Sequence, residues 1–209
     1  MSAAPDIRIA EEDALRADLY DFLGAMLSNP PSKELLRAAA GLSGDDTELG
    51  RAISGLSRVA AVTTEAAARR EFDKLFIGVG RGELLPYASY YLTGFLNEKP
   101  LAALRRDMRG LGVEREEGVF EPEDGIASLM ETMAGLIRGR FGAPASLEAQ
   151  KEFWAVHVGP WAGHFFTDLE GATSSVLYAS VGAAGRIFME IEREGFRLAP
   201  ADTEKGASA

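Results

Sequence analysis

Apolar residues recur at helical spacing along most of this chain. Between residues 15 and 26 they fall four, three, one and three positions apart, on one face of a helix with 3.6 residues per turn: Leu15, Leu19, Phe22, Leu23 and Met26. Comparable patterns predict further helices over residues 32–42, 49–56, 64–76, 101–111, 122–137, 146–157, 161–169 and 173–194. The pattern therefore predicts an all-α, single-domain bundle of about eight to ten helices.

Proline and small polar residues predict where these helices begin and end. The Asn29-Pro30-Pro31 run ends the first helix, because proline lacks an N–H group and restrains the residue before it. Ser32, Thr64 and Ser146 stand where a side-chain oxygen can cap the next helix. Small residues should let a neighbouring helix approach the last helix closely: Ala179, Gly182, Ala183 and Gly185.

The helical pattern is continuous enough for one domain. We divide the chain into a flexible N-terminus, an all-helical domain and a disordered tail, over residues 1–10, 11–198 and 199–209. The side chains that we expect in the core are Leu19, Phe22, Leu75, Phe76, Leu104, Leu129, Met133, Phe153 and Phe188.

Helical spacing breaks over residues 78–97, which we interpret as an ordered loop with one helical turn. The loop opens with three alternating glycines in Gly78-Val79-Gly80-Arg81-Gly82. A dinucleotide fingerprint needs a strand before its glycines and a helix after them, and a Walker A loop ends in Gly-Lys-Ser/Thr. Neither context is present, so the run favours a structural turn over a phosphate site.

Charge and composition exclude several classes of function. There are 22 Lys and Arg against 32 Asp and Glu, so the formal net charge is −10. An acidic chain repels phosphate backbones, which argues against nucleic-acid binding and favours basic partners. Cysteine is absent, which excludes disulfides, thiolate metal sites and cysteine nucleophiles.

No segment of the chain predicts membrane insertion. Residues 1–13 carry four acids and no apolar run, unlike a secretory signal. The most apolar stretch, residues 176–185, is half the roughly 20 residues that a membrane span needs. We therefore expect a cytoplasmic protein.

Two short segments are candidate binding elements. Tyr87, Tyr90 and Tyr91 lie within five residues, and tyrosines supply rigid, half-apolar contact area at recognition surfaces. They could equally cover the core beneath an irregular loop. Glu121-Pro122-Glu123-Asp124 places three acids at an expected helix start, where they could pair with basic groups of a partner or only stabilise the helix N-terminus.

The two histidines predict neither a metal site nor a catalytic site. His157 and His164 are seven residues apart, but Pro160 between them breaks the helical register. A hydrogen-bonded core or groove histidine is the default interpretation. No Gly-x-Ser-x-Gly elbow is present, so we expect no catalytic residues, no metal ligands and no enzyme activity.

Three motifs in order resemble the TorD/DmsD family of cytoplasmic maturation chaperones for molybdenum-containing oxidoreductases. Residues 71–76 with the following glycines and residues 85–92 resemble the family's "LF-x-G … PY-x-S-x-Y" region. Residues 121–124 resemble its Glu-Pro-x-Asp-His motif, and the segment from His157 to Trp161 resembles its late His-x-x-Pro-Trp segment. The resemblance spans residues 15–196.

The resemblance implies a dedicated chaperone that binds an apo molybdoenzyme catalytic subunit, or its twin-arginine leader, and assists cofactor insertion before export or assembly. It implies no resident cofactor, only transient contact with the molybdenum cofactor or GTP, and a monomer or homodimer. A leader has a basic segment followed by an apolar one, so its receptor should offer acids beside an aromatic, apolar groove. The expected client-binding residues are Tyr87, Tyr90, Glu121, Glu123, Asp124, His157 and Trp161.

One position departs from the family pattern. Gly125 stands where the family has a histidine, so the Asp–His pair is reduced to Asp124. In the family that pair is implicated in binding the leader. The sequence is therefore also compatible with a client that has no such leader, or with a client whose leader binds other residues of this chain.

Two other functions remain open from the sequence. One is a nucleotide-binding hydrolase that uses the glycine loop, which saturable GTP binding with turnover would support. The other is a stable assembly subunit of an oxidoreductase complex, as in the related nitrate-reductase assembly proteins. A stoichiometric complex with mature enzyme would support that alternative.

Overall fold

The computed structural model describes residues 9–79, 81–113 and 122–199. Helices are the regular secondary structure of these residues, and their one β-type pairing is an isolated bridge between Tyr87 and Gly125. The α-helices are α1 (Glu11–Ser28), α2 (Lys33–Ala40), α3 (Glu48–Val62), α4 (Glu65–Phe72), α5 (Ala88–Thr93), α6 (Lys99–Gly110), α7 (Ile126–Arg138), α8 (Leu147–Phe153), α9 (Ala162–Glu170) and α10 (Leu177–Leu198). Two π-helical segments, η1 (Asp73–Ile77) and η2 (Trp154–Val158), extend α4 and α8. The predicted all-α architecture is confirmed.

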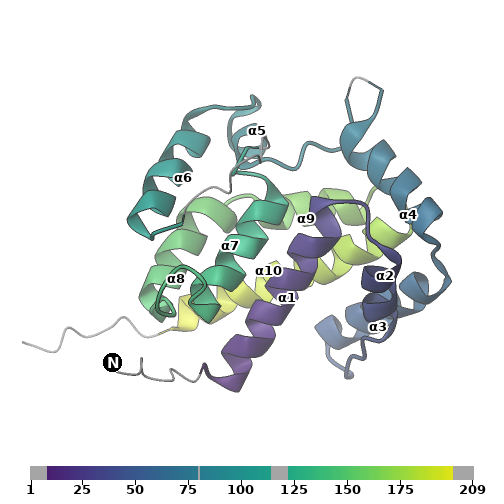
Figure 1. Ribbon diagram of the computed structural model, residues 1–209, viewed down its shortest axis with the longest axis horizontal. Coiled ribbons are helices and arrows are strands. Elements are labelled where there is room, and N and C mark those ends of the chain that lie inside the picture. The colour runs from purple at the N-terminus through teal and green to yellow at the C-terminus, as the bar shows by residue number, and fades with distance from the viewer. Residues whose placement is uncertain (1–8, 80, 114–121, 200–209) are drawn as a thin grey trace, which may run out of the picture.

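The long helix α10 runs through the middle of the molecule, as Figure 1 shows. Helix α9 packs along one side of it, and α3, α4 and α1 also contact it. Helix α1 in turn lies along α7. We call α1, α7, α9 and α10 the scaffold. Helices α2–α4 extend from one end of this scaffold, while α5 and α6 lie on the other side of the molecule (Figure 1).

Glycines allow α9 and α10 to pack closely. A Cβ atom at Gly182 would lie 2.3 Å from the backbone nitrogen of Glu170, and one at Gly185 would lie 2.3 Å from the ring of Phe166. Real Cβ atoms are not found at such distances, so a larger residue would force the helices apart. The close approach that the small-residue stripe predicts is therefore confirmed at these two positions.

The predicted helix caps are also confirmed. The hydroxyl oxygens of Ser32, Thr64 and Ser146 each accept a hydrogen bond from the backbone N–H three residues later, at Leu35, Ala67 and Ala149. Each such bond satisfies a donor that the first turn of a helix leaves free. The first described helix begins at residue 11 and the last ends at residue 198. Most of the two terminal segments that we expect to be flexible lies outside the described residues.

Most of the predicted core is buried, but the phase of the first helix is partly wrong. Six of the expected side chains are buried, namely Leu75, Leu104, Leu129, Met133, Phe153 and Phe188. Leu19, Phe22 and Phe76 are only partly buried, and Leu15 is exposed. Leu23 and Met26 of the predicted face are buried, and the buried face of α1 is completed by Ala17, Tyr20 and Leu27. The buried face is shifted toward Tyr20, whose ring is buried even though the side chain carries a hydroxyl.

A polar network inside the apolar core joins the two ends of the chain. The guanidinium of Arg16 on α1 donates to both carboxylate oxygens of Glu192 on α10, at 2.8 Å each. The hydroxyl of Tyr20 donates to the same carboxylate at 2.9 Å. The buried charge of Glu192 is thus paired and hydrogen-bonded, which a buried carboxylate requires.

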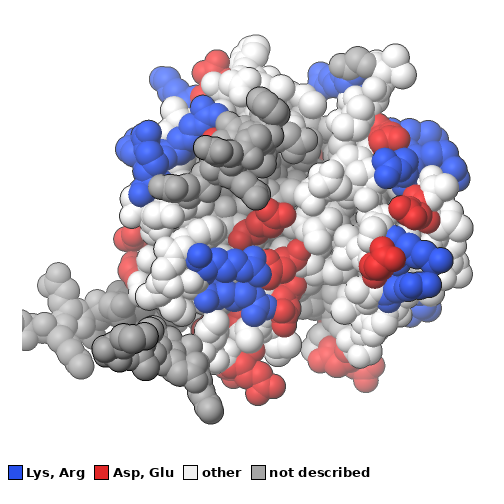
Figure 2. All heavy atoms as spheres, in the orientation of Figure 1, with Lys and Arg blue, Asp and Glu red and all other residues white. Residues whose placement is uncertain are grey.

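Acidic and basic side chains alternate on the face seen in Figure 2. Oppositely charged side chains also pair in the structure: Arg140, just after α7, donates two hydrogen bonds to Asp21 on α1, at 2.7 and 2.5 Å. The negative net charge is therefore not gathered into one acidic patch on this face. Attraction of a basic partner depends on local acids rather than on the whole surface.

Candidate functional site

Backbone hydrogen bonds join two of the motifs that the sequence singled out. The N–H of Ala88 donates to the carbonyl of Asp124 at 2.9 Å, and the N–H of Ile126 donates to the carbonyl of Pro86 at 2.8 Å. Between these bonds lies the bridge of Tyr87 with Gly125. The tyrosine-rich loop and the acid-rich turn therefore form one structural unit, although 35 residues separate Ser89 from Asp124.

Asp124 is buried and caps a helix that lies far from it in sequence. One carboxylate oxygen, Oδ2, accepts a hydrogen bond from the backbone N–H of Ser89 in the first turn of α5, at 2.8 Å. The other, Oδ1, is buried and has no hydrogen-bond partner among the described residues. Asp124 therefore does not lie in the first turn of its own helix, because α7 begins only at Ile126 and the carboxylate turns inward to α5.

The three acids of the turn do not form one exposed cluster. Glu123 accepts hydrogen bonds from Nε and Nη2 of Arg105 on α6, at 3.0 and 2.8 Å. Glu121 lies outside the described residues. Of the two described acids, Glu123 therefore lies nearer the surface and Asp124 belongs to the interior.

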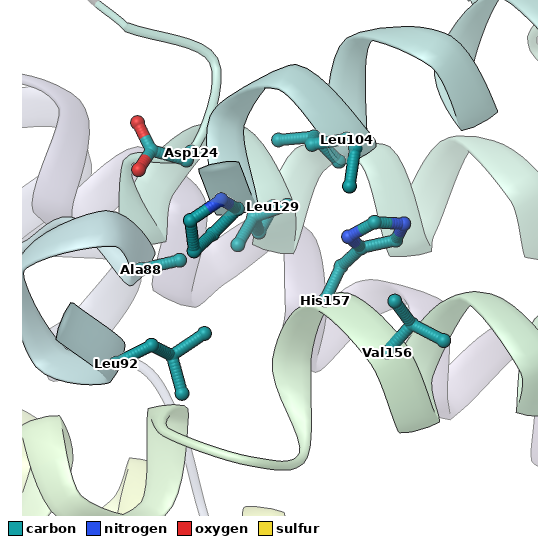
Figure 3. Close-up of a pocket in the computed structure, with 9 residues that line it drawn as sticks. Ala88, Leu92, Leu104, Asp124, Leu129, Val156 and His157 are labelled. Atoms are coloured by element: carbon teal, nitrogen blue, oxygen red, sulfur yellow. The ribbon is translucent and has the colours of Figure 1, made fainter. Parts of the chain in front are cut away.

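An apolar pocket of about 200 Å³ lies beside this turn (Figure 3). Its walls come from α5, α6, the start of α7 and η2, and they are formed by Ala88, Leu92, Pro100, Ala103, Leu104, Asp124, Leu129, Val156 and His157. Leu92 and Val156 are 43% and 54% exposed, so apolar surface continues outward from the pocket. The space is sufficient for one large apolar side chain, and binding there would remove apolar area from water.

His157 forms the wall that η2 contributes. Its Nε2–H donates to Oδ2 of Asp107 on α6 at 3.0 Å, since a carboxylate can only accept. Burial lowers the pKa of His157 below its usual value, although the hydrogen bond to Asp107 opposes this shift. The pKa of Asp107 is also lowered: burial raises it, but hydrogen bonds from His157 and Arg106 outweigh that effect. His157 is therefore neutral near pH 7 and links η2 to α6.

The three tyrosines lie in different surroundings. Tyr87 is half-buried, and its ring is the nearest side chain to the Cβ position of Gly125. The hydroxyl of Tyr90 accepts a hydrogen bond from Arg81 at 2.6 Å. The hydroxyl of Tyr91 donates to Asp168 at 2.8 Å, and its ring contacts Trp161. The rings of Tyr90 and Tyr91 also meet edge to face, with centroids 6.0 Å apart.

Trp161 is a core residue. It is fully buried, its ring lies 5.3 Å from that of Tyr91, and its Nε1–H donates to the carbonyl of His157 at 2.8 Å. A groove open to a partner cannot be lined by a side chain that solvent does not reach. The expectation that Trp161 lines such a groove is therefore wrong.

Comparison with known proteins identifies the family. The family model for the nitrate reductase delta subunit matches residues 43–167, which is more than half of the chain. This chain belongs to that family. The family includes the TorD chaperones, so the resemblance inferred from the motifs is confirmed.

Curated relatives of this chain include "Chaperone protein TorD" of Vibrio cholerae serotype O1. The two are 32% identical over 124 residues, which cover 56% of this chain and 55% of that relative. The TorD chaperone of Vibrio parahaemolyticus is 33% identical over 69 residues, 32% of each chain. This chain therefore spans about half the length of the curated relatives that it matches.

A solved structure supports the fold. The crystal structure of a protein described as a redox enzyme maturation protein, from Archaeoglobus fulgidus, superposes with a TM-score of 0.55 at 18% identity. The match covers 90% of this chain and 99% of the other. At that identity the likeness is evidence of a common TorD-like fold.

The position at which this family member departs from the TorD/DmsD motif can accept a side chain. Gly125 has φ −66° and ψ 144°, which any residue adopts. A Cβ atom there would lie 3.5 Å from the carbonyl oxygen of Pro122 and 3.6 Å from the ring of Tyr87, which are ordinary contacts. Glycine is therefore not required by the backbone at this position.

The glycine run, in contrast, has a structural cause in this family member. Gly78 has φ +61°, and a Cβ there would lie 1.9 Å from the carbonyl oxygen of Arg81. A Cβ at Gly82 would lie 2.5 Å from the carbonyl oxygen of Leu75. Both positions need glycine for a tight turn. Among the described residues, no group of three or more metal-ligating side chains gathers, and no helix is long and apolar enough to cross a bilayer.

Sequence reasoning missed most residues of the site: of the nine that line the pocket, only Asp124 and His157 were among the expected client-binding residues. Arg105 and Asp107 looked like solvent-facing charges of an amphipathic helix, and Leu92 and Val156 looked like ordinary apolar positions. Nothing local distinguishes them, because their partners lie 18 and 50 residues away in the two polar cases. One signal was available for Leu92, which directly follows Tyr91, the last position of the PY-x-S-x-Y motif.

Proposed function

We propose that this protein is a maturation chaperone that binds the apo form of a molybdoenzyme catalytic subunit. The observation that carries the proposal is the apolar pocket framed by the two joined family motifs, with Leu92 and Val156 at its mouth. An unfolded or leader-like apolar segment buries its side chains on such a surface. Binding of this kind makes and breaks no bond, so the proposed function is not enzymatic.

A twin-arginine leader is the client segment that the site fits best. Its apolar stretch would fill the pocket, and its basic stretch would lie toward Glu123 at the adjacent turn. Arginine and carboxylate pair with defined geometry and mutual attraction. Tyr87, Tyr90 and His157 stay proposed contacts, and Asp124 supports the site from inside. Retention of the client in the cytoplasm until its cofactor is inserted is the proposed outcome.

Calorimetry with a synthetic peptide tests this proposal. The peptide carries two consecutive arginines followed by about twelve apolar residues, and the protein is the full chain. Leu92→Asp should weaken binding at least about tenfold, because a charge replaces apolar contact area. The control is Ile191→Asp on α10, since Ile191 is exposed to a similar extent (47%) away from the pocket.

Two results would contradict the proposal. One is that Leu92→Asp, Ile191→Asp and the wild type bind the peptide with equal affinity while their melting temperatures are unchanged. The other is the absence of any binding by the wild type to the peptide and to a full-length apo client.

Added salt should slow association of the basic peptide and change its dissociation little.

A stable assembly subunit is the second candidate, and the delta-subunit description of the matching family model favours it. A chaperone leaves its client once the cofactor is inserted, whereas a subunit stays. Affinity purification from the native cell with mass spectrometry, followed by cofactor analysis of the captured enzyme, separates the two. Apo enzyme in the complex supports the chaperone; stoichiometric cofactor-loaded enzyme supports the subunit.

A further inference from the structure

The carboxylate that a basic client segment would contact already holds an arginine of this chain. Nε and Nη2 of Arg105 converge on Oε2 of Glu123, at 3.0 and 2.8 Å. Both bonds go to the same oxygen, so the pair is not the two-oxygen fork that an arginine and a carboxylate can form, and an arginine from another protein could make that fork with Glu123. Arg105 on helix α6 precedes Glu123 by 18 residues in the sequence.

The pair is built to exchange rather than to stabilise the fold. The side chain of Arg105 is 48% exposed, whereas that of Glu123 is 12% exposed. Water reaches the arginine, so the attraction is screened, and exposed ion pairs of this type add little to stability. The less exposed Glu123 can keep its position while the exposed arginine swings away without leaving a cavity.

We propose that Arg105 is an internal competitor for the basic part of the client, which must displace it from Glu123. This inference rests on the proposed function, because it assigns the regulation of the same site. In the free protein Arg105 neutralises Glu123, so weakly basic segments gain nothing by contacting the turn. A segment with two arginines supplies a second charge and binds in its place.

Displacement of Arg105 also acts on the pocket. The same helix contributes Pro100, Ala103 and Leu104 to the pocket wall. On its other flank, Asp107 accepts the hydrogen bond from His157. Release of Arg105 removes one of these two attachments, so α6 can yield to an apolar segment in the pocket. Binding of the basic part and binding of the apolar part are thereby coupled.

The test compares Arg105→Gln with Arg109→Gln by calorimetry, using the two-arginine peptide at low salt. Arg109 lies one turn further along the same helix and is exposed, so its replacement changes the net charge equally without touching Glu123. Arg105→Gln should tighten binding about two- to fivefold more than Arg109→Gln does, since exposed ion pairs have that strength. In a Glu123→Gln background this difference should vanish.

The outcomes separate this inference from the proposed function. If all three proteins bind the peptide and the two single variants have equal affinities, Arg105 does not compete and the inference is wrong. If neither the wild type nor Arg105→Gln binds the peptide, the basic-segment proposal fails and the inference fails with it. If only Arg105→Gln binds, or if it binds more tightly than Arg109→Gln, competition is supported. Thermal unfolding of each variant establishes that the fold is intact.

Discussion

The scaffold and the α5–α6 side of the molecule are held by different forces. In the scaffold, α1 lies against α7 and α9 against α10 over buried leucine, methionine and phenylalanine side chains. Helix α6 also buries Leu101, Leu104 and Met108, but α5 and α6 are in addition joined to the rest of the protein by four polar bonds: Ser89 to Asp124, Arg105 to Glu123, Asp107 to His157 and Tyr91 to Asp168. The pocket lies where these two regions meet.

This difference teaches how a binding protein can be stable and still adaptable. Apolar burial contributes free energy in proportion to area and cannot be removed locally without a cavity. A surface hydrogen bond or ion pair contributes little and can be exchanged for one with a partner. Of the four bonds, those of Arg105 with Glu123 and of Tyr91 with Asp168 are exposed, so these two are the ones that we expect to be exchangeable, whereas the bond of Ser89 with Asp124 is buried.

The largest expected effect lies in the scaffold. Met133 on α7 is fully buried and does not line the pocket, so Met133→Ala removes core contacts and leaves a cavity. The free energy of unfolding should fall by about 2–5 kcal/mol, measured by urea denaturation. Leu15→Ala on the exposed face of α1 is the control and should change it by less than about 0.5 kcal/mol. Equal losses for the two variants would contradict the corrected helix phase.

Asp124→Ala should have the next largest effect, because Asp124 joins the two regions. Its removal leaves the buried N–H of Ser89 without an acceptor, at a cost of about 1–3 kcal/mol. Asp124→Asn keeps an acceptor oxygen and should lose clearly less. Similar urea midpoints for the two variants would mean that the cap of α5 does not depend on this oxygen.

Tyr91→Phe should weaken the attachment of α5 by about 1 kcal/mol or less. The substitution removes the hydroxyl that donates to Asp168 but keeps the ring against Trp161. Hydrogen exchange of the α5 amides should therefore rise, while amides of α7 stay protected. Equal acceleration in both helices would show that α5 and α6 do not open separately from the scaffold.

The smallest expected effect is the dependence of stability on pH through His157. The pKa of His157 is lowered in the folded protein, so the unfolded chain binds the proton first as the pH falls below about 6.5. Stability should therefore decrease from pH 7 toward pH 5.5, and His157→Gln should reduce that slope. His164 is exposed, and His164→Gln serves as the control. If the melting temperatures of both variants fall equally across this pH range, the pH dependence does not come from His157.

The helices themselves could be predicted from the sequence, because they follow from contacts within a few residues. Spacing of apolar residues, the caps at Ser32, Thr64 and Ser146, and the glycines at 182 and 185 all act locally or on one helix face. The exception is α1, where periodicity alone could not show that Tyr20 rather than Leu15 faces inward. Its hydroxyl is buried only because Glu192, 172 residues away, accepts its hydrogen bond.

The candidate site was decided by the tertiary structure. The sequence showed the tyrosine loop, the acid turn and His157 as separate motifs, and it could not show that Asp124 points inward while Glu123 stays near the surface. Neighbouring carboxylates have the same local propensities, so their different roles depend on distant partners: Ser89 for one and Arg105 for the other. Motif identity is local, whereas burial and pairing are properties of the packed chain.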